Sequence, residues 1–195
     1  MALPTPTGLF VDKKNPNHKW FSVGREVIGL TLLDDGGTRW DEADDRYYTR
    51  DKWTDQHGRT FQPQLFYGIA QDALNRLWIV TTQGAAYIES ETDFFLSDAI
   101  VRPDFEDENG ENPITTLSIK AITVDTEGQI WIGTNDLGVY VLDSTATEIT
   151  AHYTSENSAM PANGIVSLAA DENGVVWIGT AEGLVRFDPN GSGEG

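Results

Sequence analysis

The sequence predicts an all-β protein made of about four β-propeller blades, the last of which lacks its outer strand. Three observations support this fold class: a repeated unit, a tryptophan that recurs within it at blade-sized intervals, and a turn-rich composition. Hydrophobic residues make up 39% of the 195 residues, charged residues 23%, and there are 19 glycines. This profile is typical of one globular domain with a sizeable core.

The repeated unit is a short apolar segment, an Asp-x-x-Gly turn or a variant of it, a second segment with tryptophan, and a third after a glycine turn. The clearest copies are residues 66–88, 119–142 and 165–187, and in each the turn aspartate stands six residues before the tryptophan. A weaker copy at 9–33 has a longer turn between Asp12 and Trp20. The intervals between successive tryptophans are 58, 53 and 46 residues, as in propeller blades and unlike leucine-rich or ankyrin repeats.

Each copy predicts antiparallel strands joined by turns in which aspartate accepts backbone amides and Gly or Asn supplies a positive φ. A glycine inside the second strand predicts close approach by a neighbouring blade. We interpret the repeated tryptophans as inter-blade contacts, rather than a ring that stacks on a ligand, and the aspartates as turn residues, rather than metal ligands or acids. The structural repeat residues are Trp20, Trp78, Trp131, Trp177, Asp72, Asp125, Asp171, Gly133 and Gly179.

A more polar outer strand is expected within residues 38–53 for the first blade, 93–101 for the second and 148–154 for the third. None follows Phe187. The predicted organisation is a partial propeller over residues 1–188, with a flexible tail or linker at 189–195. The predicted blades are 8–53, 65–101, 117–154 and 163–187. Propellers remove strand edges by closing a ring, so residues 1–7 either complete a small ring or, as we favour, the blades belong to a longer propeller.

Charge and composition exclude several functions. Thirteen basic against 31 acidic residues give a net charge of −18, which disfavours nucleic acid and anionic membrane as partners. The absence of cysteine excludes disulfides, zinc–thiolate sites and thiol nucleophiles. The first residues lack signal-peptide features, and no apolar run is long enough for membrane insertion.

The most individual segment is an acidic, aromatic insertion at residues 34–64. Aromatic side chains mixed with arginine and carboxylates suit a carbohydrate- or peptide-binding surface. The candidate ligand-binding residues are Trp40, Tyr47, Tyr48, Arg50 and Trp53. The alternative is that residues 46–50 are simply the half-buried outer strand of the first blade.

No motif indicates catalysis, a metal or a cofactor. The acidic loop at 104–111 has Phe105 and Thr116 where a calcium-binding EF-hand needs acidic ligands. No phosphate-binding loop or nucleophile elbow is present. The isolated histidines, none paired at ligand spacing, are His18, His57 and His152. We therefore expect a non-enzymatic protein without catalytic residues, metal or cofactor; a lyase or hydrolase on a propeller is the alternative.

Residues 125–134 and 171–184 read Asp-x-x-Gly-x-x-Trp-Ile-Gly-Thr, the second continuing to Gly-Leu. This motif resembles the two-component regulator propeller repeat. The copy at 72–85 departs from it with Ile-Val-Thr, and the copy at Asp12 departs further. Residues 15–20 and 152–157 also resemble the last blades of PorZ-like proteins, propeller-bearing surface components of the type IX secretion system.

This resemblance implies a periplasmic or cell-surface location in a Bacteroidetes-type bacterium. It implies a module that binds protein or polysaccharide as a PorZ-like secretion component. The alternative is a periplasmic ligand-sensing propeller of a hybrid two-component histidine kinase, which would act in signal transduction. The expected partners are a protein or carbohydrate ligand and the rest of a longer propeller chain.

Overall fold

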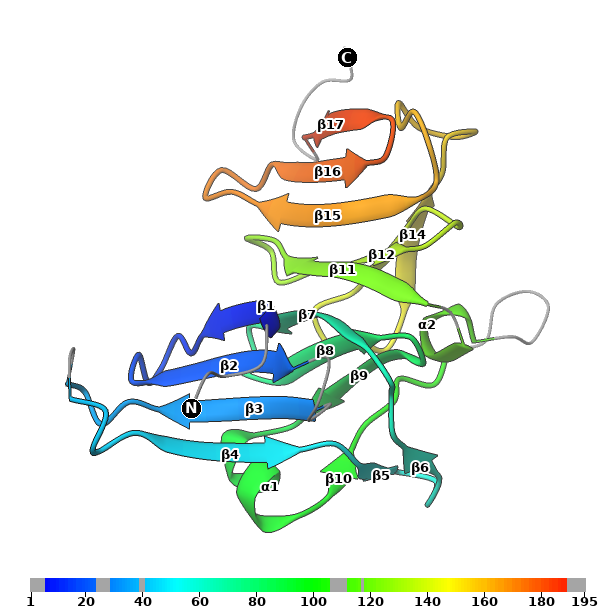
Figure 1. Ribbon diagram of the computed structural model, residues 1–195. Coiled ribbons are helices and arrows are strands. Elements are labelled where there is room, and N and C mark those ends of the chain that lie inside the picture. The colour runs from blue at the N-terminus through cyan, green and yellow to red at the C-terminus, as the bar shows by residue number, and fades with distance from the viewer. Residues whose placement is uncertain (1–5, 24–28, 39–40, 106–111, 117, 189–195) are drawn as a thin grey trace.

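The computed structural model describes residues 6–23, 29–38, 41–105, 112–116 and 118–188. They form successive antiparallel sheets whose first strands lie side by side (Figure 1). We name the four main sheets blades 1 to 4. The predicted all-β fold of propeller blades is confirmed.

Blade 1 contains β1 (Pro6–Val11), β2 (His18–Val23), β3 (Gly29–Asp34) and β4 (Arg46–Arg50). Blade 2 contains β7 (Phe66–Gln71), β8 (Leu77–Thr81) and β9 (Gly84–Ile88). Blade 3 contains β11 (Ile119–Val124), β12 (Ile130–Thr134), β13 (Val139–Leu142) and β14 (Ile149–Tyr153). Blade 4 contains β15 (Ile165–Ala170), β16 (Val176–Thr180) and β17 (Gly183–Phe187). The remaining elements are β5 (Trp53–Asp55), β6 (Thr60–Phe61), β10 (Ala99–Ile100) and the short helices α1 (Glu91–Leu96) and α2 (Pro113–Thr116).

The predicted outer strands of blades 1 and 3 are present as β4 and β14, and within the described residues, which end at 188, blade 4 has three strands. The prediction of an outer strand at 93–101 is wrong, because α1 occupies its first four residues and β10 pairs with β5 instead of with blade 2. Ser90 caps this helix: its Oγ accepts the Asp93 N–H at 3.2 Å and donates to the Asp93 carboxylate at 2.6 Å. Acidic side chains in the first turn also stabilise the helix through their interaction with its dipole. Blade 2 therefore keeps three strands and a single bridge between Tyr87 and Val101.

The turn between the first two strands has the same construction in blades 2, 3 and 4, whereas blade 1 has a longer turn in which Asp12 accepts the N–H groups of Lys14 and Asn15. In blade 3, Asp125 Oδ1 accepts the N–H groups of Glu127 and Gln129, and Gly128 has a φ of 81°. Blade 2 places Asn75, with a φ of 65°, at the equivalent position. The turn is thus closed by an aspartate side chain and a residue that tolerates left-handed backbone.

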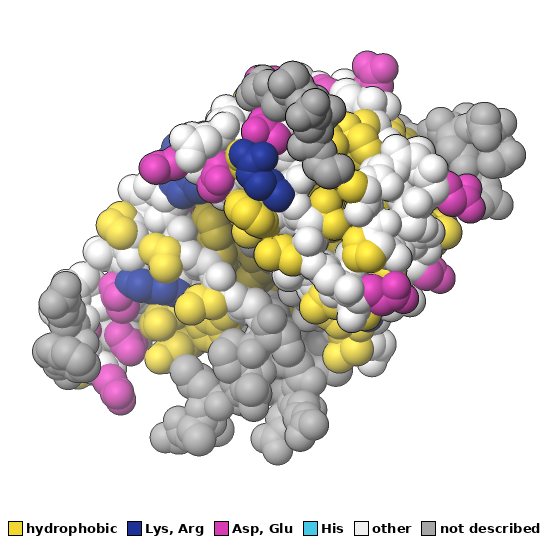
Figure 2. Space-filling model, turned by 90° about the horizontal axis from the view of Figure 1, so that it is seen from above, with side chains coloured by type: hydrophobic (Ala, Val, Ile, Leu, Met, Phe, Trp, Pro, Cys, Tyr) yellow, Lys and Arg dark blue, Asp and Glu magenta, His cyan; other side chains and the backbone are white. Residues whose placement is uncertain are grey.

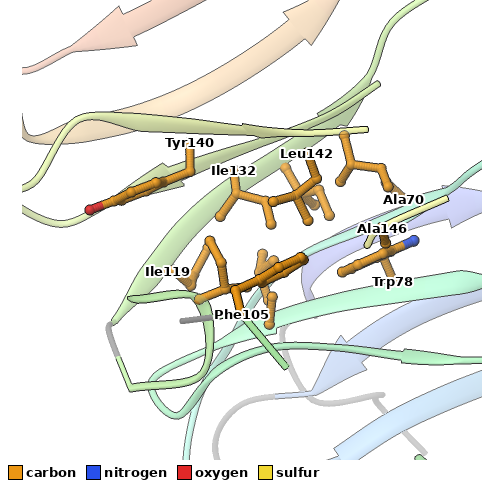
Figure 3. Packing of buried hydrophobic residues seen from close by; sticks show 13 residues of the cluster. Ala70, Trp78, Phe105, Ile119, Ile132, Tyr140, Leu142 and Ala146 are labelled. Atoms are coloured by element: carbon orange, nitrogen blue, oxygen red, sulfur yellow. The ribbon is translucent and has the colours of Figure 1, made fainter. Parts of the chain in front are cut away.

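The hydrophobic core consists of layers between blades. Trp78 of blade 2 packs against blade 3 in a cluster with Ile119, Ile132 and Leu142 (Figure 3). Trp20 lies in the layer between blades 1 and 2, and Trp131 in the layer between blades 3 and 4. The tryptophan-bearing face of each of these blades therefore packs onto the next blade along the chain.

In every blade, one equivalent register pair of the first two strands contains a glycine, on the first strand in blades 1 and 2 and on the second strand in blades 3 and 4. A Cβ on Gly133 would lie 2.5 Å from Ile165 Cγ2 of the next blade, so a glycine is needed there. In blade 2 the residue at this position is Val80, but its partner on the inner strand is Gly68. A Cβ there would lie 3.1 Å from Val80 and 3.3 Å from Ile122 of blade 3. The second strand of blade 2 can therefore carry valine in its Ile-Val-Thr sequence, because the glycine of this register pair lies on the first strand.

Candidate functional site

The outer edge of blade 1 and helix α1 together expose an aromatic surface. The rings of Tyr48 on β4 and Phe95 on α1 meet edge to face, with centroids 4.9 Å apart. Tyr48 is 40% exposed, Phe95 41% and Leu96 81%. Arg50 Nη2 donates to the Phe94 carbonyl at 3.0 Å and so ties β4 to α1. We call Tyr48, Arg50, Phe95 and Leu96 the rim patch.

Tyr47 lies on the opposite face of β4, because neighbouring residues in a strand point to opposite sides. It is 46% exposed, and its hydroxyl donates to Asp45 at 3.3 Å. Burial and the adjacent Asp45 carboxylate raise the pKa of this phenol. The structure therefore separates two tyrosines that the sequence analysis grouped into one surface.

Trp53 is fully buried, with its ring centroid 6.1 Å from those of both Phe61 and Phe66. It belongs to the layer between blades 1 and 2 and does not reach the surface. Trp40 lies outside the described residues. Of the four candidate residues that the structure describes, Tyr48 and Arg50 come together, because β4 places them on one face. The sequence analysis did not predict Phe95, the aromatic partner of Tyr48. The signal for its helix was Ser90 as N-cap with Asp93 three residues later.

Residues 53–61 of the insertion form the hairpin of β5 and β6, whose turn is polar. The Asp55 side chain is buried and accepts from Arg59 Nε at 2.7 Å and from the backbone of His57 and Arg59. His57 Nε2 lies 2.6 Å from Asp104 Oδ2, and this hydrogen bond lowers the pKa of Asp104. These contacts hold the hairpin against the segment that follows β10.

The three histidines each have a partner within the described chain. His18 contacts Glu91 and lies 3.7 Å from Asp34, His57 contacts Asp104, and His152 Nε2 lies 2.6 Å from the Leu137 carbonyl. Among the described residues, no group of three or more His, Cys, Asp or Glu side chains has the arrangement of a metal site. Nor does any described helix have the length and apolar character needed to cross a membrane.

A second exposed apolar surface lies on the tryptophan face of blade 4. Trp177 is 36% exposed and Leu184 67%, whereas Trp131 in blade 3 is 1% exposed. Figure 2 looks onto this end of the molecule and shows hydrophobic side chains gathered among charged ones. This open face is where a further blade would pack in a complete propeller.

Two segments match the family model described as two component regulator propeller, residues 113–136 and 159–182. No curated protein sequence matches the chain.

Among solved structures, the chain is similar to PorZ of Porphyromonas gingivalis, an essential bacterial surface component of the type-IX secretion system. The identity is 26% and the TM-score 0.79, over 95% of this chain and 26% of PorZ. It also resembles the extracellular domain of a protein described as a hybrid two component system from B. thetaiotaomicron, at 19% identity and TM-score 0.62, over 95% of this chain and 22% of that one.

A virginiamycin B lyase from Staphylococcus aureus matches at 12% identity with a TM-score of 0.56, over 95% of this chain and 67% of that one. The last two similarities show the fold alone. The chain spans about a quarter of the length of PorZ and of the hybrid-system domain. The matched repeats, the blade architecture and the similarity to PorZ agree with the sequence motif: this chain is a partial propeller that contains two-component regulator propeller repeats.

Proposed function

We propose that this chain is part of a non-enzymatic propeller at the bacterial cell surface, where it binds protein or polysaccharide as a PorZ-like component of type IX secretion. The similarity to PorZ supports this proposal, since it extends over 95% of the chain at a TM-score of 0.79. PorZ itself is a surface component of that system.

The observation that carries the binding role is the exposed Tyr48–Phe95 pair of the rim patch. Aromatic side chains that stay exposed beside an apolar residue such as Leu96 offer flat surfaces for sugar rings or apolar peptide side chains. Arg46 lies on the same face of β4 as Tyr48 and is exposed, so its guanidinium can donate charge-assisted hydrogen bonds to a ligand. A polysaccharide or peptide would thus lie along the outer edge of blade 1.

The test is a glycan array and a pull-down from cell envelopes, followed by calorimetry on the hits. We expect Tyr48→Ala and Phe95→Ala each to weaken binding about tenfold, equivalent to about 1.4 kcal/mol. Tyr47→Ala is the matched control, since this tyrosine is equally exposed on the other face of the strand, and its loss should change affinity less than about twofold. Equal losses in all three variants, or no ligand from either screen, would contradict a binding role for the rim patch.

The second candidate is a ligand-sensing propeller of a hybrid two-component histidine kinase. The match to the two component regulator propeller model supports it. The gene sequence beyond codon 195 distinguishes the two: a membrane helix and a kinase domain favour sensing, and a C-terminal sorting domain favours secretion. Deletion of the gene provides an independent test, because loss of secreted proteins and loss of a transcriptional response are different outcomes.

A further inference from the structure

The first strand of every blade contains a β-bulge at the same place. The pairing register shifts between Pro6 and Gly8, Phe66 and Gly68, Ile119 and Ala121, and Ile165 and Ser167. The bulged residues, each five positions before the turn aspartate, are Thr7, Tyr67, Lys120 and Val166. A bulge redirects a side chain and is found frequently beside functional sites.

The bulged position differs in chemistry from blade to blade, although its surroundings are uniform. The residue after it is always small: Gly, Gly, Ala and Ser in blades 1 to 4. That constraint follows from close packing between blades, as Gly68 against Ile122 illustrates. The bulged residue itself is Thr, Tyr, Lys or Val, so blade packing does not dictate its identity, and it is free to serve another purpose.

The bulged residues of blades 2, 3 and 4 border a hollow between the first strands of the blades. The first strands β1, β7, β11 and β15 lie next to one another, as the column of strands in Figure 1 shows. A hollow of about 210 Å³ opens between them, and Tyr67, Lys120 and Val166 are among the residues that line it. Its lining mixes polar surface with apolar side chains such as Leu9 and Ile122.

The local charge of this hollow is opposite to that of the chain as a whole. The protein has 31 acidic residues, yet the lining contains one lysine and no Asp or Glu. Lys120 Nζ lies 3.9 Å from the centroid of the Tyr67 ring. Within the described part of the chain Lys120 makes no ion pair with a carboxylate. The ring stabilises one side of the ammonium, which leaves its other N–H donors directed away from the ring.

We propose that this hollow between the first strands binds a small molecule through a carboxylate group of the ligand. The Lys120 ammonium pairs with the carboxylate, the Tyr67 hydroxyl donates a second hydrogen bond, and apolar side chains such as Leu9 and Ile122 contact the rest of the ligand. Sites for drug-sized ligands measure roughly 300–1,000 Å³, so a hollow of this size suits a single sugar acid or a short organic acid. This site is separate from the rim patch and does not depend on it.

Nuclear magnetic resonance titration of the 195-residue chain tests the proposal with glucuronate, propionate and neutral glucose as probes. We expect at least one of the two acids to saturate the amide shifts of β7 and β11 at up to about 10 mM, with glucose causing none. Tighter binding of glucuronate than of propionate identifies a sugar acid; equal binding identifies a general carboxylate site. Lack of saturation by both acids, or an equal response to glucose, overturns the proposal.

Substitutions then assign the binding to the hollow. Lys120→Met should weaken acid binding about tenfold or more, whereas Lys120→Arg keeps the charge and should stay within about threefold. Tyr67→Phe keeps the ring and should weaken binding severalfold through loss of the hydroxyl alone. Lys52→Met, which removes an exposed lysine elsewhere, is the control and should have no effect. Unchanged affinity in a Lys120→Met variant with wild-type thermal unfolding contradicts the site, and rim-patch binding measured in the same variant shows whether that separate proposal still stands.

Discussion

The indole Nε1 of Trp131 donates a hydrogen bond to Oδ2 of Asp125, with a nitrogen–oxygen distance of 2.8 Å. The same bond joins Trp78 to Asp72 at 2.8 Å, and a longer one of 3.4 Å joins Trp20 to Asp12. It links the turn to the first half of the second strand inside a buried layer, where such a bond is electrostatically stronger than in water.

Blade 4 repeats both residues, but Trp177 and Asp171 form no such bond, and Trp177 is 36% exposed. The Asp171 side chain still accepts the turn amides of Asn173 and Val175. The aspartate therefore forms the turn without help from other blades, whereas the burial of the tryptophan requires a following blade.

This contrast predicts different effects of one substitution at two equivalent positions. Trp131→Phe removes the indole donor and leaves a cavity between blades 3 and 4, so we expect it to lower the free energy of unfolding by about 2–3 kcal/mol. Trp177→Phe acts at an open face and should cost about 0.5 kcal/mol or less. Urea unfolding followed by circular dichroism measures both. If both variants lost a similar free energy of unfolding, the neighbouring blade would not determine how much this tryptophan contributes to stability.

The close approach between blades 3 and 4 predicts that Gly133→Ala is destabilising. Its new Cβ would lie 2.5 Å from Ile165 Cγ2, so the two blades must separate, at a cost of about 1–3 kcal/mol. Gly8→Ala is the control at the equivalent level of blade 1, because there the nearest atom is 3.5 Å away. Thermal unfolding measures both variants, and the stability of the Gly8 variant should lie within a few tenths of a kcal/mol of wild type. A stable Gly133 variant would mean that this layer tolerates an added methyl group.

Arg76 predicts a strong link between blades 2 and 3. It pairs with the buried Asp72 carboxylate and donates to the carbonyls of Thr145 at 2.7 Å and Ser144 at 3.0 Å. Arg76→Met leaves the Asp72 charge buried without this partner and should lower the free energy of unfolding by about 3 kcal/mol.

The control is Arg59→Met, because Arg59 pairs with Asp55 at the same four-residue spacing, but its own side chain is 57% exposed. We expect a loss of about 1 kcal/mol or less there. Chemical denaturation of both variants at pH 7 makes the comparison, and a smaller loss for Arg76 than for Arg59 would contradict the proposed link.

Asp143 predicts a pH-dependent contribution to stability. Burial alone would raise the pKa of this carboxyl, but hydrogen bonds from Thr145, Thr147 and Glu148 lower it from 3.8 to about 2. Because the folded pKa lies below the unfolded one, the stabilisation is fully present above about pH 4 and is lost as the pH falls towards 2.

We expect Asp143→Ala to lower the free energy of unfolding by about 1 kcal/mol at pH 7. The difference from wild type should narrow between pH 4 and the folded pKa of about 2. Urea midpoints at neutral and acidic pH measure this change. A difference that is the same at every pH would show that the carboxylate charge does not contribute.

The blade repeat and most strand positions follow from the sequence because they depend on neighbours in the chain. The turn at Asp125 is closed by amides within four residues of it, and this local chemistry is visible in the motif. The outer strands at 46–50 and 148–154 follow in the same way from alternating side chains. The segment at 90–101 carries both an apolar strand-like run and the Ser90 cap, and the structure forms a helix over its first part, at 91–96.

The candidate site was only partly predictable, because exposure depends on which blades meet. Trp53 and Tyr48 look alike as aromatic residues within one insertion, yet Trp53 is fully buried and Tyr48 is 40% exposed. The shared bulge at Tyr67 and Lys120 is also absent from any local pattern, since it is defined by pairing with the next strand.

By itself the sequence determined the four blade units, their order and their turn chemistry, which are set by contacts within about ten residues. Only the tertiary structure decided how far each of the four tryptophans that define the repeat is buried. Three are buried because a following blade removes them from water, and the fourth is partly exposed on an open face. Burial depends on contacts between segments distant in the chain, which periodicity does not reveal.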